Sequence, residues 1–159
     1  MLIIIRSPPG AGKSTIARGM IAAGYADVIV EIDDFWSIGG TYKYFGGLDK
    51  ESHHWAKALV KNYLLLGKRV IVPDVFETVA HVNEYVEIAK ELNLPYLVLK
   101  ANSLWSRNPD KLAELNLHGV KKHLIEQILR IWEDYPGEFP FFAETNIKDI
   151  FPSVLSNKE

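Results

Sequence analysis

The stretch "LIIIRSPPGAGKSTIARGM", residues 2–20, decides the fold. It begins as a continuous apolar run, passes through a glycine-rich turn and continues into a segment with helical spacing. Continuous apolar runs are typical of strands that are buried on both faces of a parallel sheet. We therefore predict a buried strand over residues 2–6 and a helix over residues 13–23 that is stopped by Gly24.

The turn between these two elements carries a phosphate-binding pattern. Residues 7–14 read "SPPGAGKS", and the pattern is G-x-x-x-x-G-K-[ST] between a strand and a helix. Gly10 and Gly12 allow the backbone to curl so that its N–H groups point at an anion, while Lys13 reaches the terminal phosphates and Ser14 offers its hydroxyl to Mg²⁺. We predict that a nucleoside triphosphate, ATP or GTP, is bound by Pro9, Gly10, Ala11, Gly12, Lys13, Ser14 and Thr15.

The first glycine of the pattern is replaced by Ser7. This position begins the turn and lies farthest from the triphosphate, so we expect a small serine to be tolerated. The alternative interpretation is a chance glycine turn in a parallel fold.

Composition limits the class of protein. The chain has 159 residues, 48% of them hydrophobic and 24% charged, which predicts a single globular domain over 1–159. The absence of cysteine excludes disulfides, thiolate zinc sites and cysteine nucleophiles. The apolar run at residues 1–5 is too short for a signal peptide or a membrane span, so we expect a cytoplasmic protein without membrane contact. The net charge of −2 argues against a general nucleic-acid coating protein.

Strands and helices alternate along the rest of the chain. Strands are predicted at 27–33, 69–74 and 95–101; helices are predicted at 52–67, 81–92 and 119–135, the last being the longest. The pattern is weak in the tail after Tyr135, for which we predict one short strand and a terminal turn of helix. This alternation predicts an α/β three-layer sandwich with a mainly parallel sheet, whose ligands lie beyond the carboxyl ends of the strands. Residues 7–14, Asp33, Asp34 and Asp74 then share one rim.

Carboxylates on this rim suit phosphoryl transfer. A phosphotransferase needs a base that accepts the proton of the acceptor hydroxyl close to the γ-phosphate. We interpret Asp33 as that base, with Asp34 orienting it, contacting substrate or capping the next segment. Asp74 is predicted to bind Mg²⁺, through water, or to order its loop. The alternative is that all three acids only terminate strands and turns.

Several motifs, in order, resemble the kinase module of 5′-polynucleotide kinases over roughly residues 2–135. They read "PPGAGKST", "DDFW", "SHHWAK", "GKRVIVPD" and "RNPDKLAELNLHGVKKHLIEQIL". The resemblance implies a P-loop nucleoside-triphosphate kinase fold with a helical lid at about 103–119. It further implies that Asp33 is the general base, that Lys13 and Ser14 bind phosphates and Mg²⁺, and that magnesium ATP phosphorylates a 5′-hydroxyl of DNA or RNA.

Three positions depart from that family. Phe35 and Trp36 follow the Asp pair, where phage enzymes carry an arginine and related eukaryotic modules carry aromatics. The D-x-N signature is reduced to "DVF" at 74–76, and Leu115 stands where the lid arginine is expected. An arginine that screens the transferring phosphoryl group is worth about 10³-fold or more. The candidates for a substitute are Arg107, Lys121, Lys122 and Arg130.

Aromatic and histidine side chains are the remaining candidates for substrate contacts. The cluster of Trp36, Tyr42, Tyr44 and Phe45 either stacks bases, at about 1–3 kcal/mol each, or packs a small flap. His53 contacts substrate or packs at the start of its helix. His118 matches the lid histidine of the family or stabilises its turn.

The sequence therefore predicts an ATP- and Mg²⁺-dependent phosphotransferase. The favoured acceptor is the 5′-hydroxyl of a nucleic acid, and the first alternative is a nucleoside or other small alcohol. A nucleotide-binding regulatory module with little turnover is the alternative from another class, supported by Leu115. No obligate protein partner is evident from the sequence.

Overall fold

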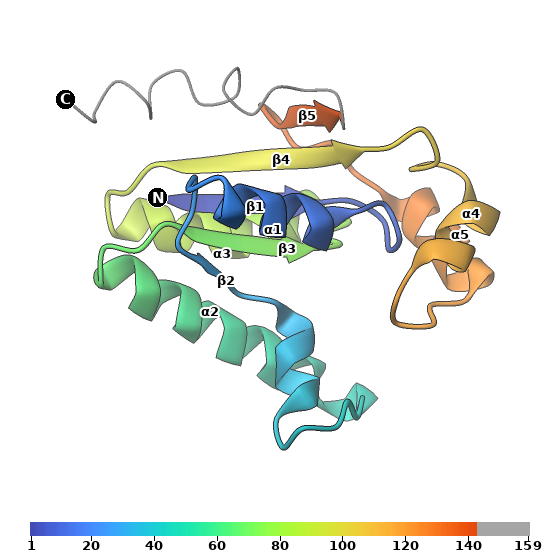
Figure 1. Ribbon diagram of the computed structural model, residues 1–159, viewed down its shortest axis with the longest axis horizontal. Coiled ribbons are helices and arrows are strands. Elements are labelled where there is room, and N and C mark those ends of the chain that lie inside the picture. The colour runs from blue at the N-terminus through green and yellow to red at the C-terminus, as the bar shows by residue number, and fades with distance from the viewer. Residues whose placement is uncertain (143–159) are drawn as a thin grey trace.

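A computed structural model describes residues 1–142, which form a five-stranded parallel sheet with helices on both faces (Figure 1). The strands are β1 (Leu2–Arg6), β2 (Val28–Ile29), β3 (Val70–Asp74), β4 (Tyr96–Asn102) and β5 (Phe139–Phe142). Their order in the sheet is β2-β3-β1-β4-β5, and each pair of neighbours is parallel. The chain has the α/β sandwich that its alternating pattern predicts.

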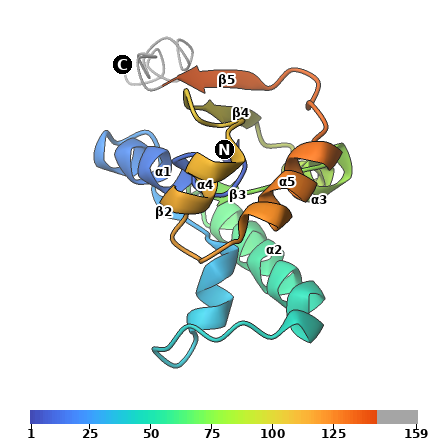
Figure 2. The same cartoon turned by 90° about the vertical axis from the view of Figure 1, so that its right-hand side faces the viewer.

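The helices cover the two faces of this sheet. They are α1 (Lys13–Ala22), α2 (Asp49–Leu65), α3 (Val79–Glu91), α4 (Pro109–Leu115) and α5 (Lys122–Ile131), with short 3₁₀ helices η1 (Ile32–Ser37) and η2 (Gly46–Leu48). Figure 2 shows α1 on one side of the sheet and α3 and α5 on the other. No helix among residues 1–142 is long and apolar enough to cross a membrane.

The central strand β1 is covered by helices on both faces of the sheet, and this explains why Leu2–Ile5 are all apolar. Leu2 and Ile4 pack into the core beneath α2 and α3, whereas Ile3 and Ile5 pack beneath α1. All four side chains are fully buried. The phosphate-binding pattern follows directly, so its loop begins from a fully buried strand at the centre of the sheet.

Arg6, the last residue of β1, is fully buried. Its guanidinium donates to the carbonyl oxygen of Phe76 from Nε (3.0 Å) and Nη2 (2.6 Å), and to that of Glu133 from Nη2 (2.7 Å). Its Nη1 also forms an ion pair with Glu138 at 2.8 Å, and the guanidinium lies 4.3 Å from the centre of the Trp132 ring. Arg6 therefore joins the end of β1 to the segment that follows α5.

The strands at 2–6, 69–74 and 95–101 and the helices at 13–23 and 81–92 are confirmed with small shifts of their ends. The strand predicted at 27–33 is wrong beyond Ile29, because Asp33 and Asp34 lie in η1, after the chain has left the sheet edge.

The prediction of a helix at 119–135 is too long. Gly119, with φ of 67°, precedes the helix, the extended backbone of Trp132 ends it, and α2 is longer at 17 residues. In the tail, β5 matches the predicted short strand, and the predicted terminal turn of helix lies outside the described residues.

Candidate functional site

The loop after β1 is shaped by two glycines in the left-handed conformation. Gly10 has φ of 82° and Gly12, which caps α1, has φ of 97°. Such a loop, ending at a helix N-terminus, is a general architecture for binding anions. Ser7 is buried with an ordinary backbone conformation, and its hydroxyl donates to the Pro8 carbonyl at 3.2 Å. A serine therefore fits the first position of the loop without strain.

Lys13 folds back into this loop. Its Nζ donates to the carbonyl oxygens of Ser7 (3.1 Å) and Pro8 (3.2 Å). Burial lowers the pKa of Lys13 to about 8, although the carboxylates of Asp74 and Asp33 act in the opposite direction. Within residues 1–142, Lys13 forms no ion pair, so the cation is held by carbonyl oxygens alone.

Asp74 lies beside the start of the loop. It pairs in register with Arg6 across β3 and β1, so it ends its strand at the level where the loop begins. Burial raises the pKa of Asp74, and the positive charges of Lys13 and His53 partly oppose this shift. The Nδ1 of His53 lies 3.3 Å from the Tyr85 hydroxyl. Asp74 therefore lies close enough to Lys13 and His53 for their charges to act on it.

Asp33 contacts the tip of the lid. Its Oδ2 lies 3.1 Å from Nε2 of His118, and the side chain remains 45% exposed. Burial, together with a hydrogen bond to Asp33, raises the pKa of Tyr42, whose ring stacks on His118 at 5.8 Å. Asp34 is exposed, and its backbone N–H donates to the carbonyl of Glu31. Asp33, and not Asp34, is thus the acid that faces the lid.

The lid turn that carries His118 is built by Asn116. The Nδ2 of Asn116 donates to the carbonyl oxygens of Leu112, Ala113 and Val120, each at 3.0 Å. Its Oδ1 accepts from the backbone N–H of Val120 at 2.7 Å. The asparagine of "LNLHGV" therefore holds the turn in which His118 stands over Asp33.

The lid also packs on the phosphate-binding loop. The Nε1 of Trp105 donates to the Gly10 carbonyl at 3.0 Å. Ala11 packs in one apolar cluster with Leu112 of α4 and Ile125 of α5. A Cβ at Gly10 would lie 2.6 Å from the Leu112 carbonyl oxygen. The lid is therefore closed on the loop, and the glycine permits that approach.

Gly10→Ala is expected to destabilise the protein by about 2–4 kcal/mol, because left-handed backbone strain adds to a clash with a backbone atom. Gly24→Ala is the matched control, since Gly24 has φ of 79° and no atom within 4 Å of a Cβ. We expect it to cost only the strain, about 1–2 kcal/mol. Urea unfolding of both variants measures the difference, and equal losses would contradict a close approach of the lid.

Trp36 and Tyr44 differ in accessibility. Trp36 is 6% exposed, and its ring packs against those of Phe35 (5.0 Å) and Tyr44 (4.8 Å). This burial matches the packing interpretation of Trp36. Tyr44 is 57% exposed, and its hydroxyl donates to Asp49. The ring of Tyr44 is therefore accessible to solvent, whereas the ring of Trp36 is buried against it.

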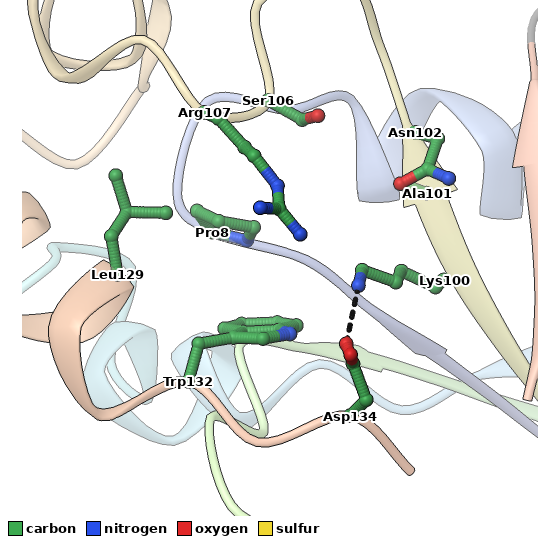
Figure 3. A pocket seen from close by; sticks show the side chains of 9 residues that line it. All are labelled: Pro8, Lys100, Ala101, Asn102, Ser106, Arg107, Leu129, Trp132 and Asp134. Atoms are coloured by element: carbon green, nitrogen blue, oxygen red, sulfur yellow. Dashed lines mark hydrogen bonds and ion pairs between the residues drawn. The ribbon is translucent and has the colours of Figure 1, made fainter. Parts of the chain in front are cut away.

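The cations considered as substitutes for the lid arginine lie in different places. Arg107 projects into a cavity lined by Pro8 and Trp132 (Figure 3). Lys122 forms an ion pair with Asp110 at 2.8 Å. Arg130 is exposed in the last turn of α5. The lid residue that reaches Asp33 is His118, whose position sequence reasoning had left open between a lid role and a turn role.

Two contacts of the site escaped the sequence analysis. The N–H of Trp105 fixes the loop at Gly10, although nothing in the local sequence distinguishes this tryptophan from a residue that only packs in the core. Tyr42 reads as one of several aromatic residues, and its bond to Asp33 depends on a fold of residues 38–48 that no local pattern specifies. The dipeptide Asn108-Pro109 was an available signal for the lid helix, because Asn108 caps α4 and proline occupies its first turn.

Comparisons with known proteins agree with this architecture. No protein-family profile matches the chain. Human NEDD4-binding protein 2 is 29% identical over 136 residues, which are 85% of this chain and 8% of that protein. A putative kinase from Chloroflexus aurantiacus superposes with a TM-score of 0.70 at 13% identity, covering 99% of this chain and 98% of the other. The chain has a P-loop kinase fold.

A chain in the structure of the Pnkp1/Rnl/Hen1 RNA repair complex is also similar. The TM-score is 0.67 at 22% identity, over 82% of this chain and 43% of that one. The chain thus spans less than half of this neighbour and about one-twelfth of the human relative. These similarities establish the architecture in which the loop, the acids and the lid are set.

Proposed function

We propose that this protein is an ATP- and Mg²⁺-dependent phosphotransferase that transfers the γ-phosphate to a hydroxyl group, with the 5′-hydroxyl of a polynucleotide as the favoured acceptor. The observation that carries the proposal is the arrangement around Lys13. A cation without an ion-pair partner among the described residues sits in an anion-binding loop, with Asp74 on one side and Asp33 beneath the lid.

The residues of the loop fit a bound triphosphate. Lys13 is held only by carbonyl oxygens, and a phosphate would supply the negative charge that those oxygens lack. Ser14 follows Lys13 in the first turn of α1, and Asp74 lies at the end of β3. These two side chains would hold Mg²⁺, with Asp74 acting through water. When bound, Mg²⁺ would neutralise part of the phosphate charge.

Asp33 would act as the general base. Its carboxylate is accessible to an acceptor, and one of its oxygens is fixed by His118. An ionised Asp33 would accept the hydroxyl proton as the oxygen attacks the γ-phosphate. The closed lid would exclude water from the transfer, and water would otherwise compete as an acceptor.

Exposed aromatic rings beside Asp33 support a polynucleotide acceptor. Tyr42, Tyr44 and Phe45 are each about half exposed, at 45%, 57% and 58%. Bases stack on such rings with about 1–3 kcal/mol each. The sequence resemblance to polynucleotide kinase modules points to the same acceptor class.

The charge around the base favours a second candidate, a small uncharged alcohol or nucleoside. Residues 31–50 contain four acidic side chains (Glu31, Asp33, Asp34 and Asp49) and two basic ones (Lys43 and Lys50). An acidic rim repels the phosphates of a nucleic acid. The candidate from another class is a nucleotide-binding module with little turnover, which Leu115 at the lid arginine position favours.

Transfer of γ-labelled phosphate from magnesium ATP tests these candidates. The acceptors are 5′-hydroxyl DNA and RNA oligonucleotides and a panel of nucleosides and small alcohols. Label on an oligonucleotide end supports the first candidate, and label only on a small alcohol supports the second. Saturable ATP binding without transfer to any acceptor would overturn the phosphotransferase and leave the binding module.

His118→Ala is expected to lower kcat by about 10–100-fold, because hydrogen bonds to charged groups contribute about 1.5–3 kcal/mol. The KM for the acceptor should rise, while ATP affinity should change little, since His118 contacts Asp33 and not the loop. His123→Ala is the matched control, because His123 is exposed on α5. Steady-state kinetics of both variants measure this, and equal kinetics would show that the contact with Asp33 has no role.

A further inference from the structure

A cavity of about 330 Å³ lies behind the phosphate-binding loop, between the end of β4, the segment before α4 and the end of α5 (Figure 3). It is lined by Pro8, Lys100, Ala101, Asn102, Ser106, Arg107, Leu129, Trp132 and Asp134. This size falls within the range of small-molecule sites. None of the roles derived above for Lys13, Asp33 or Asp74 uses this cavity.

The lining of the cavity contains a buried hydrogen-bond donor without an acceptor. The Nε1 of Trp132 is buried and has no partner within residues 1–142. A buried donor left unpaired costs about 1–3 kcal/mol. Figure 3 shows the guanidinium of Arg107 projecting across the cavity toward the Trp132 ring. An acceptor placed in the cavity would pair these donors.

The other charged side chains around the cavity are paired with one another, and Arg107 is not. Lys100 forms ion pairs with Asp134 at 2.8 Å and with Glu138 at 3.7 Å. Asp134, the acidic residue of the lining, is therefore already paired with a cation. The guanidinium of Arg6, which lies 4.3 Å from the Trp132 ring, is likewise paired, with Glu138 at 2.8 Å. Arg107 is therefore the lining cation that forms no ion pair among residues 1–142, and an anion would pair with it.

We propose that this cavity binds the oxyanion group, a phosphate or a carboxylate, of a small metabolite, independently of the nucleotide. Arg107 would pair with two oxygens of the group in the bidentate manner of guanidinium–oxyanion contacts. The indole N–H of Trp132 and the hydroxyl of Ser106 would donate to the same group. Arg107 is thereby assigned to this second site and not to the transferring phosphate.

The two sites are adjacent but distinct. Pro8 lines the cavity with its side chain, while its carbonyl accepts from Lys13 on the loop side. The indole N–H of Trp105 is bonded to Gly10, so its NMR signal is sensitive to binding at the phosphate-binding loop. The indole N–H of Trp132 lies at the cavity, so its NMR signal is sensitive to binding there. The indole N–H resonances of these two tryptophans therefore distinguish the two sites in one NMR experiment.

The test is a titration of the full chain with sodium phosphate, and separately with sodium acetate, followed in ¹H–¹⁵N spectra. Trp132→Phe assigns the cavity resonance. We expect a saturable shift of the Trp132 signal that is at least about tenfold weaker in affinity in Arg107→Gln, a loss of about 1.4 kcal/mol. Arg130→Gln removes an exposed arginine of α5, the helix that ends at the cavity, and should leave the shift unchanged. Unchanged dispersion of the spectrum shows that each variant is folded.

Each outcome decides the proposal. A response to phosphate alone identifies a phosphate site, and a response to both anions identifies a general oxyanion site. A shift of Trp105 only would mean that anions enter the phosphate-binding loop and would overturn the cavity site. A Trp132 shift that fails to saturate, or that persists in Arg107→Gln, would overturn it as well. Failure of phosphoryl transfer in the labelling assay would leave this result unaffected.

Discussion

Asp33→Asn is expected to lower kcat for phosphoryl transfer by about 10²–10⁴-fold, the contribution of a positioned general base. The asparagine amide has the shape of the carboxylate and its oxygen can still accept from His118, so the lid contact is retained. What is lost is the capacity to take the acceptor proton. ATP affinity should remain within a few-fold, because Asp33 contacts His118 and makes no hydrogen bond or ion pair with Lys13 among residues 1–142.

Asp34→Asn is the matched control for this variant. Asp34 is the adjacent acid in η1, it is exposed, and its backbone and not its side chain makes the described contact with Glu31. We expect Asp34→Asn to retain most of the rate. Initial-rate kinetics over acceptor and ATP concentration measure both variants. If Asp34→Asn lost as much kcat as Asp33→Asn, the assignment of the base would be wrong.

Lys13→Met is expected to abolish measurable nucleotide binding and, at the same time, to stabilise the protein without nucleotide. Binding fails because the variant removes the cation that faces the triphosphate. The stability rises because burial lowers the pKa of Lys13 from 10.5 to about 8, which shows that the folded state disfavours its charge. A pKa shift of this size corresponds to up to about 3 kcal/mol in the free energy of unfolding.

The stability gain expected for Lys13→Met should depend on pH in a definite direction. Below pH 8 the lysine is protonated in both the folded and the unfolded chain, so the full cost of burying the charge is present. Between pH 8 and 10.5 the unfolded chain binds more protons, and the stability of the natural protein rises with pH from this group. The advantage of Lys13→Met should therefore be largest near pH 7 and vanish near pH 10.5.

Urea unfolding at pH 7 and pH 10 measures that advantage, and calorimetry with ATP measures binding. Lys57→Met is a suitable control, because Lys57 lies outside the loop and pairs with Glu84 at 2.7 Å. It should leave ATP binding intact. A Lys13→Met protein that is less stable than the natural one at pH 7 would contradict the buried cation.

Much of the fold could be predicted because its central strands are buried on both faces. Residues 2–5 and 70–73 are apolar without interruption, and that pattern allows few other structures. The edge strand β2 was overestimated, because "DVIVEID" has strand propensity along its whole length while only Val28 and Ile29 find a partner in β3. Pairing at a sheet edge is decided by tertiary contacts that propensity does not contain.

The candidate site was predicted where the chemistry is local and missed where it depends on distant segments. Lys13, Gly10 and Gly12 belong to one continuous motif whose spacing specifies the loop. The contact of Asp33 with His118 joins residues far apart in the chain. Arg107 likewise lines a cavity together with Trp132, the residue that ends α5 and lies 4.3 Å from the guanidinium of Arg6.

Arg6 has a practical consequence for dissecting the chain into fragments. Its charge is satisfied by Glu138 and by the carbonyl of Glu133, both of which come after the last helix of the lid region. A fragment that stops at Ile131 would keep the phosphate-binding loop and every proposed catalytic side chain, yet would leave the buried cation without its ion pair and with only the Phe76 carbonyl as acceptor. An unpaired buried charge of this kind costs about 3–5 kcal/mol, so the smallest fragment that folds should extend through β5.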